Sequence, residues 1–388
     1  MSIQNLKIAI VGGGPGGLTL ARLLQMNGAA VQVYERDLDK HARVQGATLD
    51  LHTDSGLKAL EKAGLMDAFR ANYRPGADKT RIVDQDAQIF LDDHAVQQEE
   101  EAFGDLYFRP EIDRGPLRKM LLDSLDPDTV IWNSHFKSMQ QKGDGWELTF
   151  QNGSSAVADL VIAADGANSK IRPLITSIRP FYSGVTALEG SVYDAEQRVP
   201  RIYDLLKGGK IFALGNGQTI IVSSKGDGSL AFYAGFRAAE NWTSQSGIDF
   251  ADPASVLNWF KREFETWDNI WQDLFTYASG ALIPRPLYCM PLDQQWDALP
   301  NLTMLGDAAH LMPPYAGEGV NMAMLDALEL SEHLLDDGFK DLQSAIASFE
   351  SKMLERTAQV AGESLDNTLW MHENGALAKM MAMFEQPQ

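Results

Sequence analysis

The feature that most constrains this chain is a glycine-rich turn, Gly12-x-Gly14-x-x-Gly17. It follows a β-branched apolar run at residues 7–11 and precedes leucines at helical spacing, so the pattern predicts a strand, a turn and a helix. In such a turn, the first glycine permits the tight bend and the second lets a pyrophosphate approach the backbone. The third glycine allows the helix to pack closely on the strand. Because the helix N-terminus presents free N–H groups to an anion, we expect a dinucleotide-binding βαβ unit.

A second predicted strand, residues 31–34, leads directly into Glu35. A carboxylate at this position accepts hydrogen bonds from the ribose hydroxyls of an adenosine and disfavours a 2′-phosphate. The βαβ unit is therefore predicted to hold FAD or NAD rather than NADP, and the motif alone does not choose between the first two. Arg36, the next residue, either lies against the adenine or is a solvated charge.

Two further segments place polar residues directly after predicted strands. Asp165-Gly166 follows a buried strand at residues 160–164, and Gly306-Asp307 follows a strand at residues 302–305. An aspartate in this position can accept a hydrogen bond from a ribityl hydroxyl. The helix that begins near residues 319–321 would direct its positive end at a ligand, where it would stabilise the negative charge of a reduced flavin.

With these motifs in the same order and spacing, the chain resembles the class A FAD-dependent monooxygenases, the aromatic-ring hydroxylases of the p-hydroxybenzoate hydroxylase type. The resemblance covers about residues 6–335. Within that family the chain is most similar to the tetracycline-inactivating monooxygenases, on the stretches 34–37, 42–43, 48–52, 110–114, 117–118 and 306–314. The resemblance implies an α/β fold: a Rossmann-type FAD-binding domain, an inserted antiparallel β-sheet substrate domain and a C-terminal helix.

Carried over by position, the resemblance implies FAD contacts at Glu35, Arg36, Asp50, Arg114 and Asp307, with Arg43 near the isoalloxazine. The full predicted cofactor-binding set is Gly12, Gly14, Gly17, Glu35, Arg36, Arg43, Asp50, Arg114, Asp165, Asp307, Pro314, Gly317, Gly319, Val320 and Asn321. His310 is interpreted as a loop-orienting residue rather than a catalytic base, and Glu318 stands where glutamine is common in the family.

For the substrate, the predicted residues are Glu189, Lys210, Ala231 and Met371. The first three align with a glutamine, an arginine and a histidine on the substrate-facing sheet of the tetracycline-inactivating enzymes. Because all three differ, another polycyclic or phenolic substrate is an open alternative. Met371 is placed on a C-terminal helix beside the substrate cavity.

The function that the resemblance implies is NAD(P)H- and FAD-dependent monooxygenation of a phenolic or polycyclic compound through a flavin C4a-hydroperoxide. Inactivation of a tetracycline-type antibiotic is its most specific form. The alternatives are a hydroxylase of another aromatic metabolite, an FAD oxidase or dehydrogenase, and a non-catalytic flavin-binding protein. The flavin does the chemistry, so no residue is assigned as catalytic and no metal is expected. NADPH or NADH would bind transiently, since the sequence has no second Gly-x-Gly-x-x-Gly motif.

Composition restricts the partners. The formal charge of −20 disfavours nucleic acids and anionic membrane surfaces, which would repel the chain. The single cysteine, Cys289, excludes an internal disulfide. No apolar run approaches the length of about 20 residues that a membrane-spanning helix needs. We expect a cytoplasmic monomer whose partners are a small-molecule substrate and O2.

The predicted domain organisation has four parts: residues 1–178 and 285–340 for the FAD-binding domain, 179–284 for the substrate-binding sheet, and 341–388 for a C-terminal helical segment. Residues 75–105 are a candidate addition to the substrate domain. The patterns also predict one helix at residues 55–71, and one helix carrying Trp259, Phe260, Phe264, Trp267 and Trp271.

Overall fold

The computed structural model describes residues 3–42, 48–95, 103–105 and 108–385. The chain divides into two compact units. Unit 1 comprises residues 1–73, 103–181 and 289–364, and unit 2 comprises residues 74–102, 182–288 and 365–388.

Unit 1 is built on a five-stranded parallel sheet with the strand order β17-β11-β1-β2-β7. Strands β1 and β11 are apolar along almost their whole length, as expected of parallel strands covered on both faces. The bounds are β1 Lys7–Val11, β2 Ala30–Tyr34, β7 Val130–Ile131, β11 Leu160–Ala163 and β17 Leu302–Met304.

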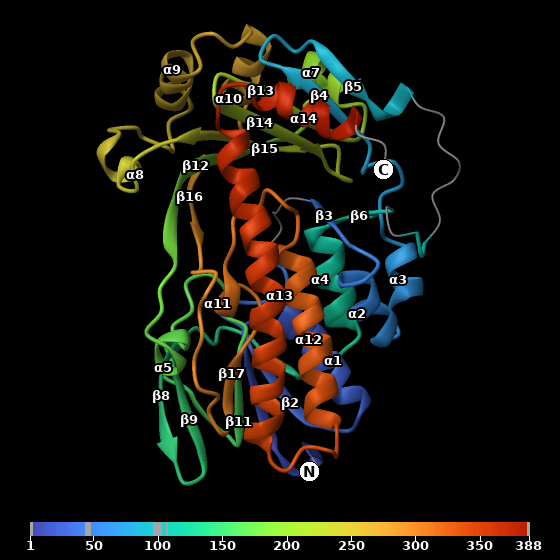
Figure 1. The fold of residues 1–388 in the computed structure, drawn as a ribbon, viewed down its shortest axis with the longest axis vertical. Coiled ribbons are helices and arrows are strands. Elements are labelled where there is room, and N and C mark those ends of the chain that lie inside the picture. The colour runs from blue at the N-terminus through green and yellow to red at the C-terminus, as the bar shows by residue number, and fades with distance from the viewer. Residues whose placement is uncertain (1–2, 43–47, 96–102, 106–107, 386–388) are drawn as a thin grey trace. The chain divides into compact units, whose positions relative to one another are not determined.

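Two long helices pack together in this unit, α1 (Pro15–Met26) and α12 (Gly319–Leu335) (Figure 1). A three-stranded antiparallel sheet, β10-β9-β8, and a two-stranded sheet, β3-β6, complete its strands. The remaining bounds are η1 Ile3–Asn5, β3 Thr48–Asp50, α2 Gly56–Lys62, α3 Met66–Arg70, β6 Glu111–Asp113, α4 Arg114–Asp123, β8 Phe136–Lys142, β9 Gly145–Phe150, β10 Ser155–Ala158, α5 Arg172–Ile175 and α11 Asp307–His310. Helix α13 (Leu342–Met371) begins in unit 1 and ends in unit 2.

Unit 2 is built on a seven-stranded sheet with the order β16-β12-β15-β14-β13-β4-β5. Strands β12, β15, β14 and β13 are antiparallel to their neighbours in that order, whereas β13 and β4 are parallel. The strand bounds are β4 Thr80–Asp84, β5 Ile89–Asp92, β12 Phe181–Val192, β13 Lys210–Gly215, β14 Gln218–Ser224, β15 Leu230–Arg237 and β16 Ile283–Cys289.

One face of this sheet is buried under short helices. Leu188, Phe232 and Ile220 from the strands pack with Phe260 and Phe275 from the helices in a single hydrophobic core. The helix bounds are η2 Asp93–Ala95, α6 Ala195–Arg198, α7 Pro200–Leu206, α8 Trp242–Gln245, α9 Pro253–Glu263, η3 Asn269–Trp271, α10 Gln272–Thr276 and α14 Ala376–Glu385.

The structure confirms the predicted fold class, an α/β protein with a Rossmann-type parallel sheet, a largely antiparallel second sheet and C-terminal helices. Two element predictions were wrong. The helix predicted at 55–71 is two helices, because Gly64 between α2 and α3 has a φ of +71° that ends the first. The aromatic helix ends at Glu263, and Trp271 lies in the separate turn η3. No helix in the described ranges is long and apolar enough to cross a membrane.

Candidate functional site

The glycine turn has the geometry that a pyrophosphate requires. Gly12 has a φ of +114°, and a Cβ added to it would lie 2.1 Å from the Ala164 carbonyl oxygen. A Cβ on Gly17 would lie 2.2 Å from the Gly12 oxygen, whereas one on Gly14 would meet no atom within 4 Å. The turn is therefore closed on its protein side and open in front of Gly14. The α1 N-terminus has no side-chain cap, which leaves its first N–H groups available to an anion.

The side chain of Glu35, directly after β2, is held in place by hydrogen bonds from backbone N–H groups. The residue is 3% exposed, and its carboxylate accepts hydrogen bonds from Gly13 N at 2.6 Å and from Asp37 N at 2.9 Å. Arg118 donates to Asp37 Oδ2 at 3.0 Å and lies 5.4 Å from the centre of the Trp132 ring. These contacts hold the carboxylate beside the open glycine turn, which fits an adenosine ribose. Arg36, in contrast, is exposed.

Asn321 joins the start of α12 to strand β3. Its side chain is fully buried and donates to the carbonyl oxygens of Asp50 at 3.0 Å and Gly317 at 3.2 Å. Its Oδ1 accepts from His52 N at 2.9 Å. Gly317 has a φ of +72°, and a Cβ there would lie 3.1 Å from the Asp50 carboxylate. The predicted residues Asp50, Gly317 and Asn321 are thus in one place, at the N-terminus of α12 with Gly319 and Val320.

Arg172 joins the two downstream segments. Its guanidinium donates to the carbonyl oxygens of Ala308 at 2.6 Å, Asp307 at 2.7 Å and Ala167 at 3.2 Å. The residue is 6% exposed. It fixes the segment after β11 against the segment after β17, so the predicted residues Asp165 and Asp307 are held in neighbouring loops.

Both aspartates lie in surroundings poor in water. Burial raises the pKa of Asp165 against the opposing effect of a hydrogen bond from Ser169. Its Oδ2 accepts from Lys170 N at 2.9 Å, and its buried Oδ1 has no partner within the described part of the chain. Burial also raises the pKa of Asp307, opposed by the charges of His310, Arg114 and Arg172. An orphaned buried carboxylate oxygen fits a ligand that brings hydroxyl donors, as a ribityl chain does.

His310 lies in a buried ionic network behind the same loop. Its Nε2 is 2.5 Å from Asp326 Oδ2, which also accepts from Gly306 N at 2.9 Å. Arg356 donates to Asp326 Oδ1 at 2.5 Å and also pairs with Glu329. Through Asp326, His310 is connected to Gly306 at the start of this loop, and its role as a loop-orienting residue stays a prediction.

Three of the predicted substrate residues, Glu189, Lys210 and Ala231, share one face of the unit 2 sheet. In the strand register, Lys210 pairs with Ser223, which pairs with Ala231, and Ala231 pairs with Ser191. Glu189 lies two residues from Ser191 and therefore on the same face. Glu189 belongs to a neighbouring row of residues that are paired across the strands. In this row it pairs with Tyr233, which pairs with Ile221, which pairs with Phe212. This face is opposite the hydrophobic core described above, and the Glu189 row on it is half-buried.

The charge of Glu189 is compensated on that face. Arg285 Nε on β16 donates to Glu189 Oε2 at 2.8 Å. Met371 ends α13 in the same unit and is buried. The next residue, His372, makes a hydrogen-bonding contact of 3.2 Å with Thr219 Oγ1 on β14 and accepts a 2.7 Å hydrogen bond from Arg237 Nε through its carbonyl oxygen.

The FAD binding domain family (FAD_binding_3) matches residues 5–211 and 300–359. The chain belongs to this family. The 3-amino-4-hydroxybenzoate 2-monooxygenase PtnB3 of Streptomyces platensis is 30% identical over 373 residues, which span 93% of this chain and 87% of that protein. Together, the family and its relatives make this chain an FAD-dependent monooxygenase.

Solved structures share the fold of this monooxygenase at low identity. Klebsiella pneumoniae HpxO complexed with FAD and uric acid has a TM-score of 0.77 at 20% identity, covering 99% of this chain and 93% of that one. The tetracycline destructase Tet(55) has a TM-score of 0.73 at 19% identity, covering 99% and 96%. At these identities the likeness shows the fold alone.

The contacts described above leave out some of the predicted cofactor-binding residues and include two arginines that were not predicted. Arg43, the predicted neighbour of the isoalloxazine, lies outside the described residues. Arg172 and Arg118 received no role from the sequence, although Arg172 closely follows Asp165-Gly166 and Arg118 lies in one of the stretches that carry the resemblance. Pro314 is exposed in the loop before α12, and Arg114 begins α4 directly after β6. No group of three or more His, Cys, Asp or Glu side chains in the described ranges could hold a metal ion.

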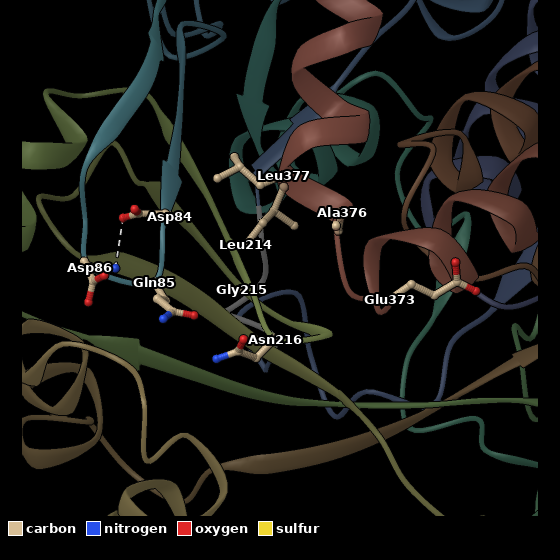
Figure 2. Close-up of a pocket in the computed structure, with 10 residues that line it drawn as sticks. Asp84, Gln85, Asp86, Leu214, Gly215, Asn216, Glu373, Ala376 and Leu377 are labelled. Carbon is tan, nitrogen blue, oxygen red and sulfur yellow. Dashed lines mark hydrogen bonds between the residues drawn. The ribbon is translucent and has the colours of Figure 1, made fainter.

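Unit 2 of the monooxygenase also contains a cavity of about 190 Å³ between the β4–β5 turn, the β13–β14 turn and the start of α14. Figure 2 shows its acidic side, where Asp84 accepts a 2.9 Å hydrogen bond from Asp86 N. Glu373, also in the lining, pairs with Arg237 at 3.4 Å. None of the predicted site residues lines this cavity.

Proposed function

We propose that this monooxygenase hydroxylates an electron-rich aromatic compound, with NADPH or NADH as reductant and O2 as the oxygen source. The observation that carries the proposal is the half-buried sheet face of unit 2, where Tyr233, Ile221 and Phe212 form a row beside Glu189. Aromatic and aliphatic side chains in a row offer a flat apolar surface to an aromatic ring. The 30% identical relative is named for an aromatic substrate, 3-amino-4-hydroxybenzoate.

When bound, FAD would supply the redox chemistry that links the nicotinamide cofactor to O2. The protein's own groups bind and orient. The free N–H groups at the start of α1 hold the pyrophosphate, and Glu35 holds the adenosine ribose. Asp165 and Asp307 accept hydrogen bonds from ribityl hydroxyls. Arg36, which is exposed, and Arg43, which lies outside the described residues, are the candidates to meet the phosphates of the nicotinamide cofactor.

Two substrate classes fit this proposal, a single phenolic or heteroaromatic ring and a tetracycline-type polycycle. The first is supported by the relative that covers most of both chains at 30% identity. The second is supported by the fold of Tet(55) and by the stretches 34–37 and 306–314. Because the Glu189 carboxylate is already paired with Arg285, we favour the first class, in which ring packing rather than a free carboxylate selects the substrate.

The test is oxidation of NADPH and of NADH by the FAD-loaded protein with a panel of hydroxybenzoates, hydroxypyridines and tetracyclines under ¹⁸O2. The expected result is faster oxidation with one class and a product that carries one ¹⁸O atom. A labelled tetracycline would establish the antibiotic class instead. Stoichiometric peroxide without any labelled product would replace the proposal with an oxidase. A protein that does not retain FAD would overturn it.

A further inference from the structure

His52 lies between two carboxylates at the N-terminus of α12. Its Nε2 is 3.1 Å from Asp50 Oδ2, and its Nδ1 is 3.1 Å from Glu318 Oε1. The imidazole is 8% exposed and each carboxylate 20%. Both ring nitrogens face acceptors, and both can donate only when the ring is an imidazolium. The three side chains therefore form a partly buried cluster with one positive and two negative charges.

The charge state of the cluster follows from its surroundings. Burial alone would lower the pKa of His52, but hydrogen bonds and charges from Asp50 and Glu318 outweigh it and raise the pKa to about 9. Asp50, from β3, and Glu318, from the residue before α12, are the carboxylates in contact with His52. Glu111 on β6 is buried and pairs with Asp50 in the β3–β6 register. Asp54 and Lys58, on the adjoining turn and on α2, are exposed. At neutral pH the cluster has a net charge of −1.

The cluster is connected to the loop that begins α12. His52 donates its backbone N–H to Asn321, whose side chain donates in turn to the carbonyl oxygen of Gly317. The Asp50 carboxylate lies directly against Gly317. A change in the charge of His52 therefore changes the electrostatic potential at the N-terminus of the 17-residue helix α12.

We propose that His52 is a positioning residue that holds Asp50 and Glu318 in place and offsets one of their two negative charges at the flavin end of α12. This inference rests on the proposed binding of FAD by unit 1. A reduced flavin that carries negative charge is destabilised by each added negative charge nearby and stabilised by its removal. His52 thus makes reduced flavin easier to form, and Glu318 makes it harder.

The test is the midpoint potential of bound FAD, measured by titration against reference dyes in the purified holoprotein. His52→Gln gives the cluster a charge of −2. The ratio of affinities for reduced and oxidised FAD should fall on the order of tenfold, which is about 30 mV for a two-electron couple. Glu318→Gln gives a charge of 0, and the potential should rise by a similar amount. The double variant has the wild-type charge of −1, and its potential should return close to the wild-type value.

The matched control is His333→Gln, near the C-terminal end of the same helix and about 21 Å from Gly319 along its axis. It should leave the potential unchanged. The difference between wild type and His52→Gln should also disappear above pH 9, as His52 loses its proton. If His52→Gln does not bind FAD, Glu318→Gln and the pH dependence of the wild-type potential still test the predicted direction of the shift in midpoint potential. Shifts in the same direction for both single variants, or no shifts with FAD normally bound, would overturn the inference alone. A wild-type protein without FAD would overturn it together with the proposed function.

Discussion

At the scale of single residues, Glu35 is the group whose change should affect the cofactor most. Its two oxygens accept from Gly13 N at 2.6 Å and Asp37 N at 2.9 Å. In Glu35→Gln, one oxygen is replaced by an amide NH2 that faces another donor. We expect the affinity for FAD to fall on the order of 100-fold, because a buried charge-assisted hydrogen bond contributes about 2–3 kcal/mol. Titration of the apoprotein with FAD, followed by flavin fluorescence, measures this.

The control is Glu332→Gln, the same substitution at an exposed position of α12, which should bind FAD as the wild type does. A Glu35→Gln protein with wild-type affinity would show that Glu35 does not hold the ribose.

The same residues show what a sequence can and cannot reveal about a site. Gly12 and Gly17 could be identified because the close backbone approaches of the turn demand glycine at that spacing. The role of Glu35 in ribose binding stays a prediction from its place at the end of the second strand. Arg172 could not be identified, because two of its three partners are backbone carbonyls 135 and 136 residues away, and any residue type supplies a carbonyl. The role of His52 could not be identified either, since the carboxylate of Glu318 reaches it from a distant part of the chain.

At the scale of elements, α13 is joined to the edge strand β17 by a buried carboxyl group. Glu350 is 3% exposed and accepts from Thr303 Oγ1 at 2.7 Å. Burial raises its pKa to about 7. Because the folded-state pKa is above the unfolded value, the neutral carboxyl is favoured by folding. Its contribution is fully present below about pH 4.5 and is lost as the pH rises through 7.

We therefore expect stability to fall by about 3 kcal/mol between pH 4.5 and pH 8 on account of this group. Glu350→Gln cannot ionise and should lack that part of the pH dependence. Urea unfolding at several pH values measures it, with Glu363→Gln at an exposed position of α13 as the control. An unchanged pH slope in Glu350→Gln would mean that Glu350 is charged in the folded protein.

Helix and strand boundaries were predictable where periodicity and end signals agreed. Strand β1 matches its predicted residues, and β11 begins at the predicted Leu160. The aromatic residues 259–271 have helical spacing, yet the chain leaves the helix at Glu263 and buries Trp271 from η3. Burial in the unit 2 core, rather than a continuous helix, satisfies these side chains. A periodicity of large apolar residues alone does not distinguish one continuous helix from a helix followed by a separate short element.

At the scale of the whole molecule, the formal charge of −20 should govern the encounter with an anionic reductant. NADPH carries more negative charge than NADH, so long-range repulsion slows its approach more. Raising the ionic strength from about 0.01 M to 0.15 M shortens the Debye length from about 30 Å to 8 Å and screens that repulsion. We expect kcat/KM for NADPH to rise severalfold over this range, and kcat/KM for NADH to rise less.

The comparison of the two cofactors separates screening from a local effect. Salt that acts on the protein's structure would change both rates equally, whereas screening acts in proportion to the charge on the cofactor. The rates are measured by stopped-flow reduction of the bound flavin at a fixed pH. A fall in kcat/KM for NADPH with added salt would contradict the expectation. It would mean that a local cluster of cations, such as one including Arg36, dominates the approach in spite of the net charge.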